Sequence, residues 1–188
     1  MTNWHVITGG PSSGKTTTVN LLRERGYTTT IEHARHYLDL QRIEGRTVTE
    51  VRSRQQEFQL GVLTMQLAEE AALDPEQLVF LDRAIPDSLA YYRFLDLEPD
   101  PVLLEALQRV SYRTVFLLDL LPLAPDYART EDATAQRRIH DLLGEVYREL
   151  QFPVVEVPVM EPTERVDFIL ERVRVERALQ SRSIASSP

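Results

Sequence analysis

Cysteine is absent from this 188-residue sequence, and no apolar segment approaches the ~20 residues that a membrane-spanning helix needs. The first absence excludes disulfide bonds and thiolate metal sites, and the second argues against a membrane protein. Positive charge is also scarce, because 21 Lys and Arg residues face 29 Asp and Glu residues, for a net charge of −8. Nucleic-acid surfaces usually need a basic face, so the charge argues against a nucleic-acid partner. The N-terminus lacks the basic and then apolar pattern of a signal peptide, so we expect a soluble, cytoplasmic protein.

Lysine is the rarest basic residue, since Lys15 is the only lysine and the other 20 basic residues are arginine. It lies in Gly9-Gly10-Pro11-Ser12-Ser13-Gly14-Lys15-Thr16, which matches G-x-x-x-x-G-K-[ST], the phosphate-binding loop (P-loop). A compact ammonium suits the position between β- and γ-phosphates better than the broad fork of arginine. The residues predicted to hold the donor nucleotide are Gly10, Pro11, Ser12, Ser13, Gly14, Lys15, Thr16 and Thr17.

The segments that flank this loop decide between a real motif and a chance match in a Gly/Ser turn. Residues 4–7 form an apolar run that predicts a strand, and residues 17–24 have the apolar spacing of a helix. The helix N-terminus would add unpaired N–H donors and a partial positive charge next to the phosphates. The context therefore favours a nucleotide-phosphate site.

Five predicted strands alternate with helices along the chain. The strands are expected at 4–7, 27–31, 78–81, 114–118 and 154–157, and the helices at 17–24, 33–38, 49–73, 86–95, 101–110, 133–150 and beyond an N-cap at Thr163. This order predicts the α/β class, as a five-stranded parallel sheet with helices on both faces in three α/β/α layers. We expect one domain over residues 1–180 with an irregular lid at about 119–132, and a disordered tail at 181–188.

Ligands of such sheets bind beyond the carboxyl ends of the strands, where several polar side chains are expected. Asp82 follows a buried strand and could bind Mg²⁺ through water, beside the Thr16 hydroxyl, or accept a hydrogen bond from a substrate hydroxyl. It could instead cap a helix or pair with Arg83. Glu32 could act as a general base or substrate anchor, or only stabilise the first turn of the next helix. Arg83 could orient a substrate or be a surface cation, and Asp87 could touch substrate or cap a helix.

The irregular segment 119–132 contains Arg129, which we expect to neutralise charge on a transferred phosphoryl group. Arg137 and Arg138 lie further along, where a solvated helix face is the better interpretation. Asp132 is predicted to cap the helix that begins at the next residue.

Three segments resemble a known family. They are Gly9 to Thr16 (G-G-x-S-S-G-K-T), Ile31-Glu32-His33-Ala34-Arg35, and Phe80-Leu81-Asp82-Arg83-Ala84-Ile85-Pro86-Asp87-Ser88. They are similar to the AAA-type P-loop ATPase/nucleoside-kinase-like family, related to the ribosylnicotinamide kinase domain of the bacterial NAD-biosynthesis regulator. The resemblance spans roughly residues 4–170.

The resemblance implies the nucleoside/nucleotide-kinase form of the P-loop NTPase fold, with ATP and Mg²⁺ at residues 9–16. It also implies that Glu32, Arg35, Asp82 and Arg83 face the phosphoryl acceptor. Pro11 stands where the ribosylnicotinamide kinases tend to carry an acidic residue, so the acceptor stays open.

Two functions fit these residues. The first is ATP- and Mg²⁺-dependent phosphoryl transfer to a small nucleoside- or nucleotide-like acceptor. In it Lys15, Asp82, Arg129 and Glu32 act in catalysis, and Glu32, Arg35, Arg83 and Asp87 bind substrate. The second is a regulatory or assembly ATPase without a small-molecule acceptor. A GTP switch would need a further lysine in an N-K-x-D loop, a polynucleotide 5′-kinase conflicts with the acidic charge, and a non-catalytic module would not need Lys15, Thr16 and Asp82 together. The oligomeric state stays open.

Overall fold

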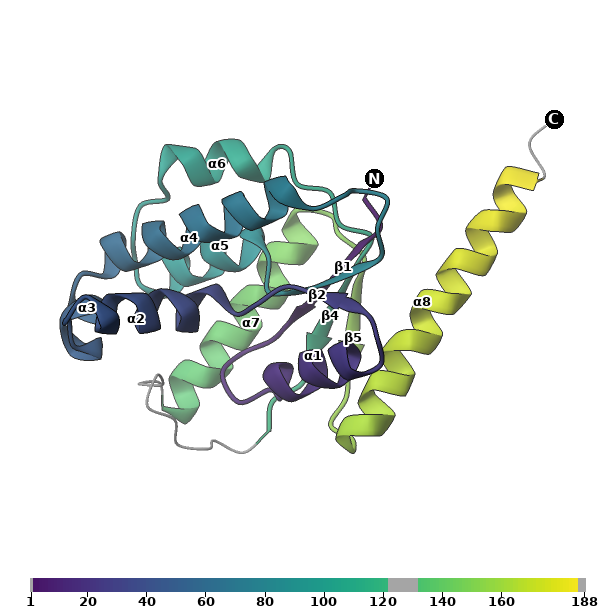
Figure 1. The fold of residues 1–188 in the computed structure, drawn as a ribbon, viewed down its shortest axis with the longest axis horizontal. Helices are drawn as coiled ribbons and strands as arrows, with labels where there is room; N and C mark the ends of the chain where they lie inside the picture. The colour runs from purple at the N-terminus through teal and green to yellow at the C-terminus, as the bar shows by residue number, and fades with distance from the viewer. Residues whose placement is uncertain (1, 122–131, 186–188) are drawn as a thin grey trace.

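The computed structural model describes residues 2–121 and 132–185, which contain one five-stranded sheet (Figure 1). The strands are β1 (Trp4–Thr8), β2 (Thr28–Thr29), β3 (Val79–Asp82), β4 (Thr114–Leu118) and β5 (Val154–Val157). The helices are α1 (Lys15–Glu24), α2 (His33–Ile43), α3 (Val48–Ser53), α4 (Gln55–Ala72), α5 (Ile85–Phe94), α6 (Pro101–Leu107), α7 (Ala133–Glu149) and α8 (Pro162–Ala185). The sheet order is β2-β3-β1-β4-β5, and all the described pairings are parallel. The predicted α/β fold with five parallel strands is confirmed.

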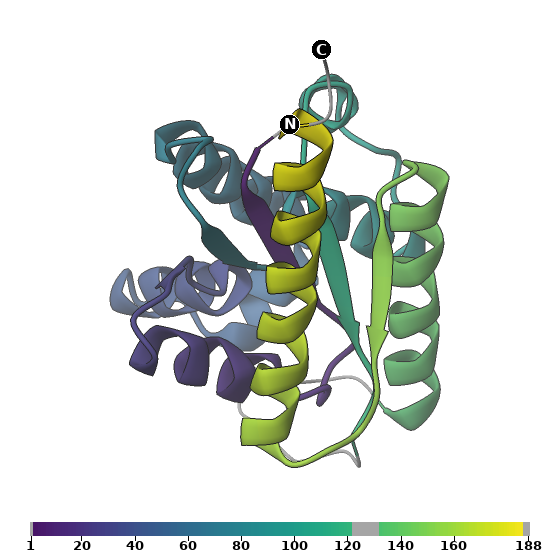
Figure 2. The ribbon, with the colours of Figure 1, turned by 90° about the vertical axis from the view of Figure 1, so that its right-hand side faces the viewer.

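The sheet separates two apolar cores because successive residues of a strand point to opposite faces. Ile7 and Phe80 pack against the inner sides of α1 and α8. Val6 and Val115 point to the opposite face, where Tyr147 of α7 lies. Figure 2 shows α8 lying along one face of the sheet, with α7 on the opposite face. These contacts give the three layers that the alternation of strands and helices predicts.

The order of the strands determines where a ligand can bind. The chain moves from β1 outward to β2 and β3 on one side, and then crosses to β4 and β5 on the other side. The loops that leave the carboxyl ends of β1 and its neighbours therefore separate and open a crevice at this edge of the sheet.

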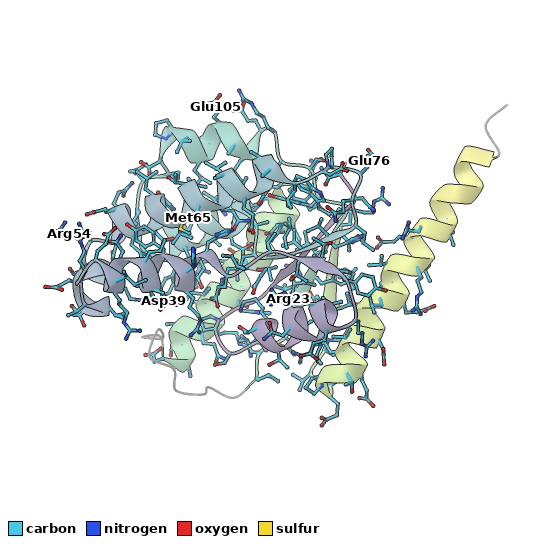
Figure 3. All side chains as sticks on the ribbon, viewed as in Figure 1. Arg23, Asp39, Arg54, Met65, Glu76 and Glu105 are labelled. Carbon is cyan, nitrogen blue, oxygen red and sulfur yellow. The ribbon has the colours of Figure 1, made fainter. Side chains whose placement is uncertain are left out.

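Several predicted elements differ from the structure. The strand expected at residues 27–31 is only Thr28–Thr29, since this edge strand pairs with β3 alone and leaves the ladder after two residues. The single helix expected at 49–73 is divided into α3 and α4 at Arg54, whose backbone leaves the helical region (φ −100°, ψ 66°). Ser53 Oγ donates to the carbonyl of Glu50 at 2.8 Å and so competes with the helical backbone there. Arg54 marks this junction at the outer end of the molecule (Figure 3).

Helix α8 also begins and ends at other residues than predicted. It starts at Pro162, so Thr163 lies inside the helix and is not its N-cap. Proline is favoured at a first helical position because its missing N–H has no partner there anyway. The helix continues to Ala185, where the sequence predicts a disordered tail from Ser181, because neither Gly nor Pro interrupts it after Pro162. None of the helices in the described ranges combines the length and apolar content needed to cross a membrane.

Candidate active site

The loop between β1 and α1 folds around the side chain of its own lysine. Lys15 Nζ donates to the carbonyl oxygens of Gly9 and Gly10 at 2.8 and 2.9 Å and to Ser13 Oγ at 3.2 Å. Burial lowers the pKa of Lys15 to about 7, and the nearby charge of Arg83 acts in the same direction. A buried ammonium whose hydrogen-bond acceptors are neutral oxygens gains from an anionic ligand, which would favour its charged form.

Two glycines allow the backbone to follow this path. Gly9 and Gly14 have φ of 147° and 82°, values that residues with a Cβ rarely adopt. An added Cβ would lie 2.6 Å from the carbonyl oxygen of Leu118 at Gly9, and 2.7 Å from Arg165 Nη1 at Gly14. The loop therefore needs glycine at both positions, for space as well as for conformation.

The first turn of α1 provides donors for an anion. The first helical hydrogen bond runs from Thr18 N–H to the carbonyl of Gly14 at 3.0 Å, so the N–H groups of Lys15, Thr16 and Thr17 precede the helical ladder. Thr16 and Thr17 are exposed. This end of the helix is suited to bind phosphate oxygens.

A cavity of about 670 Å³ extends from this loop to α2, α3, α4 and α5. Residues 11–17 line this cavity. The predicted acceptor residues Glu32, Arg35, Arg83 and Asp87 line it as well. Gly10 lies against α7 instead, where its N–H is 3.4 Å from His140 Nδ1. The fold thus brings most of the predicted donor and acceptor residues to one cavity.

Glu32 is held by two arginines. Its Oε1 lies 3.5 Å from Arg83 Nη2, and its Oε2 lies 3.5 Å from Arg35 Nε. Burial alone would raise the pKa of Glu32, but the charges of Arg83, Lys15 and Arg35 outweigh burial and hold the pKa below its usual value. Glu32 is therefore a carboxylate at neutral pH, able to accept a hydrogen bond from an incoming hydroxyl group.

Asp82 ends β3 beside the P-loop and is buried. Its N–H donates to Thr30 Oγ1 at 2.8 Å, while its Oδ1 is buried with no hydrogen-bond partner among the described residues. Burial, followed by the nearby charge of Glu32, raises the pKa of Asp82 to about 6. An unsatisfied buried carboxylate oxygen is costly unless a cation or donor joins it.

Arg83 and Asp87 lie just beyond β3. The Arg83 guanidinium donates to Tyr91 Oη at 3.1 Å, and its backbone has a φ of 69°, which is rare for a residue with a side chain. Asp87 accepts from the N–H of Ala84 at 3.1 Å, from Thr8 Oγ1 at 2.6 Å and from the hydroxyl of Tyr147. These bonds favour the helix-capping role for Asp87, because both of its oxygens already have donors.

The arginines predicted after β4 have three different outcomes. Arg129 lies outside the described residues. Arg137 borders a separate cavity of about 390 Å³ between α7 and β5, which is not the cavity described above. Arg138 is exposed and lies 3.7 Å from Glu145, consistent with a solvated face. Asp132 caps α7 as predicted, since its carboxylate accepts from the N–H of Ala135 at 2.8 Å.

Sequence reasoning missed several residues at this site. Arg52 and Gln59 line the cavity from α3 and α4, and Gln136 and Arg165 touch the outer side of the P-loop from α7 and α8. Gln59 is 5% exposed, although a polar side chain on the apolar side of a helix is unusual. A polar residue on the apolar side of a predicted helix was therefore the sequence signal that could have identified Gln59. No local pattern marks Gln136 or Arg165.

The residues present fit a magnesium ion bound together with a nucleotide. Within the described ranges, no group of three or more His, Asp or Glu side chains could hold a metal ion alone. Magnesium usually keeps several waters and takes one or two protein oxygens plus substrate phosphates. The unpaired Oδ1 of Asp82 and the exposed hydroxyl of Thr16 match that requirement.

Comparison with known proteins found a family model and several solved structures that are similar to this chain. A model of the AAA domain family matches residues 4–165, and a comparison with curated protein sequences gave no match. Deoxyadenosine kinase from M. mycoides, solved with the products dCMP and a flexible dCDP, has a TM-score of 0.62 at 13% identity, over 92% of this chain and 98% of that chain.

Two further solved structures are similar. NadR protein in complex with NAD and AMP-PNP has a TM-score of 0.61 at 18% identity, over 89% of this chain and 48% of that chain. Thymidylate kinase from Ehrlichia chaffeensis has a TM-score of 0.58 at 15% identity, over 90% of this chain and 97% of that chain. With its family model covering most of the sequence, this chain belongs to the AAA domain family and has the P-loop nucleoside kinase fold.

Proposed function

We propose that this protein is a phosphotransferase that moves the γ-phosphoryl group of ATP to a small nucleoside- or nucleotide-like acceptor. The observation that carries the proposal is the single cavity shared by the P-loop and by Glu32, Arg35 and Arg83. A pure ATPase needs the first set of groups, whereas a kinase needs both sets facing one another.

On the donor side, the N–H groups at the start of α1 and the ammonium of Lys15 bind the phosphates and neutralise charge as the phosphoryl group moves. Magnesium, when bound with ATP, supplies further neutralisation of the phosphate oxygens. Thr16 and Asp82 would hold it. Arg129 is proposed as an additional cation for the transferred group.

On the acceptor side, Glu32 accepts a hydrogen bond from the attacking hydroxyl group and orients it toward the γ-phosphate. Its lowered pKa makes it a weak base, which suits a loose transition state in which the proton leaves late. Arg83 and Arg35 fix the position of this carboxylate, and their charge also favours an acceptor that carries phosphate.

The remainder of the cavity fits a flat ring. Its walls include Phe58, Tyr91, Phe94 and Val62, which are aromatic or branched apolar side chains. Gln59 adds a buried amide to the wall of the cavity. A ring with a neighbouring donor and acceptor on its edge, such as a nucleobase or a pyridine carboxamide, would satisfy this amide.

The experiment that tests the proposal is a transfer assay with γ-labelled ATP and a panel of nucleosides, nucleoside monophosphates and vitamin ribotides. We expect a labelled product with at least one acceptor. Glu32→Gln should lower the transfer rate about 100-fold or more while leaving ATP binding intact, because the amide keeps the shape of Glu32 but cannot take the proton of the acceptor hydroxyl. Thermal shift by ATP in the same variant checks that the donor site is unchanged.

ATP hydrolysis by the wild type without a labelled product from any acceptor would contradict the proposal. That result would favour the regulatory or assembly ATPase instead. Stimulation of the hydrolysis by a protein partner would strengthen that second function.

A further inference from the structure

The outer side of the P-loop is held by side chains from two helices that follow it by more than one hundred residues. Gln136 Nε2 of α7 donates to the carbonyl of Pro11 at 2.9 Å, across a sequence separation of 125 residues. Arg165 Nη1 of α8 donates to the carbonyl of Ser13 at 2.7 Å, across 152 residues. Between them, the N–H of Leu121 donates to the carbonyl of Ser12 at 3.0 Å. Three consecutive carbonyl groups therefore each have a donor outside the loop.

These contacts determine the direction of the peptide N–H groups. A trans peptide is planar, and its N–H points opposite to its carbonyl. With the carbonyls of residues 11, 12 and 13 held by these donors, the N–H groups of residues 12, 13 and 14 point the opposite way. That of Ser13 donates to the carbonyl of Gly10 at 3.3 Å within the loop. A peptide that turned over would present a carbonyl oxygen to a phosphate and would repel it.

Gln136 holds two segments with one amide nitrogen. The same Nε2 donates to the carbonyl of Leu121 at 3.0 Å, so both of its hydrogens are used. Because both partners are carbonyl oxygens, the amide can satisfy them only with its NH₂ group. Gln136 thus ties the P-loop to the segment that leaves β4.

Arg165 is an expensive group for a fold to place at this point. It is 3% exposed, and its Nε and Nη2 have no hydrogen-bond partner among the described residues. Desolvating a guanidinium is unfavourable unless it is compensated, and apolar residues would pack there without that penalty. Its guanidinium also lies against Gly14, where a Cβ would come within 2.7 Å of Nη1.

We propose that Gln136 and Arg165 are positioning residues of the donor-phosphate site, which keep the P-loop preformed for a triphosphate. The inference rests on the proposed function, since it assumes that the loop binds ATP. Neither residue is among those that line the cavity. They act on the loop carbonyls, so their effect is expected on the polyphosphate part of the donor and not on its base or on the acceptor.

The test measures the dissociation constants of ATP and of inorganic tripolyphosphate, both with magnesium, for the wild type and the variants. The measurements are made well below the lowest melting temperature of the variants. Arg165→Met and Gln136→Glu should each weaken both ligands by about tenfold or more, the range expected for losing a hydrogen bond to a charged group or an amide. Gln136→Glu keeps the shape but places carboxylate oxygens against two carbonyls. Arg165→Lys keeps a cationic donor and should recover most of the affinity.

Arg172→Met is the matched control, because Arg172 lies on the same helix over the ring of Phe168. It should leave both dissociation constants unchanged. If Arg165→Met fails to fold, the other two variants still test the inference. Gln136→Glu changes a residue on a different helix, and Arg165→Lys is a milder change at the same position. A variant with a lowered melting temperature but wild-type affinity for tripolyphosphate would overturn the inference, as would weakening confined to ATP. Failure of the wild type to bind either ligand would instead refute the proposed function.

Discussion

Individual side chains in this cavity act in groups, and Glu32 is the centre of one such group. Its carboxylate stays ionised because Arg83, Lys15 and Arg35 oppose the effect of burial on its pKa. Arg83 in turn is fixed by Tyr91, whose hydroxyl accepts at 3.1 Å. The geometry therefore places a prepared hydrogen-bond acceptor in the cavity that the P-loop also lines.

Gln59 provides a test of the acceptor side that leaves the donor side alone. Gln59→Leu keeps the volume but removes the amide, so an acceptor ring would lose its hydrogen-bond partner. We expect KM for the acceptor to rise about tenfold or more, with the dissociation constant of ATP unchanged. Steady-state kinetics with the acceptor found in the transfer assay gives both values. An unchanged KM would mean that the ring does not reach α4.

Gln56 is a matched control, because it lies on the same helix as Gln59 but is exposed and does not line the cavity. Its Nε2 donates to Asp100 Oδ2 at 3.1 Å. Gln56→Leu should leave the KM of the acceptor as in the wild type.

At this scale, sequence alone predicts the residues that belong to a motif or end a strand. Lys15 and Thr16 are defined by their spacing from Gly9, and Glu32 and Asp82 by the ends of apolar or β-branched runs. Gln136 and Arg165 depend on which helices pack beside the loop. That information lies in the tertiary arrangement and has no local signature.

Among the elements, α7 contacts both the cavity and the P-loop. Its N-terminus borders the cavity through Asp132 and Ala135, and Gln136 one residue later holds the P-loop. The Asp132 cap fixes where this helix begins and hence where Gln136 lies.

Removing this cap should weaken the fold measurably. Asp132→Ala leaves the N–H of Ala135 without its acceptor and should lower the free energy of unfolding by about 1 kcal/mol. Asp132→Asn keeps a capping oxygen and should recover most of that loss. Urea denaturation of the three proteins gives the comparison. Equal stability of the Ala and Asn variants would show that the cap does not hold α7.

Element boundaries were predictable where apolar periodicity stops, as at β4 and β5, whose predicted ranges are confirmed. The junction of α3 and α4 was not predictable, because Val51 and Phe58 keep a helical spacing across it. Both residues pack on Leu38 of α2, so the break concerns the backbone while the pattern of burial continues through it.

The molecule as a whole contains a further buried carboxyl group, which does not line the cavity of the proposed site. Glu70 of α4 accepts from Tyr112 Oη at 2.7 Å, from Gln66 Nε2 at 2.8 Å and from the N–H of Ile85 at 3.3 Å. It joins α4 to the starts of α5 and β4. Burial raises the pKa of Glu70 to about 7 despite these donors.

This shift makes the stability of the whole fold depend on pH. Between pH 4.5 and about 7, the folded protein holds a proton on Glu70 that the unfolded chain releases. The contribution of Glu70 is therefore complete below pH 4.5 and is lost as pH rises through about 7. Glu70→Gln cannot ionise, so its stability relative to the wild type should increase across this window, by at most on the order of 3 kcal/mol.

Urea denaturation of both proteins at several pH values measures this difference. Parallel stability curves for the two proteins would contradict it. His5 provides an opposite slope in both proteins, since burial lowers its pKa to about 4 and stability falls as pH drops below 6.5. Because His5 is present in both proteins, its contribution cancels in the difference between their two stability curves.

The central claim is that residues 9–16 hold a triphosphate through the lone lysine of the chain. The most direct measurement is a calorimetric titration of wild type and Lys15→Met with ATP and magnesium. We predict saturable one-to-one binding by the wild type and a loss of about 100-fold or more in affinity for the variant, at a melting temperature close to that of the wild type. No binding by the folded wild type, or equal affinities in the two proteins, would contradict the account.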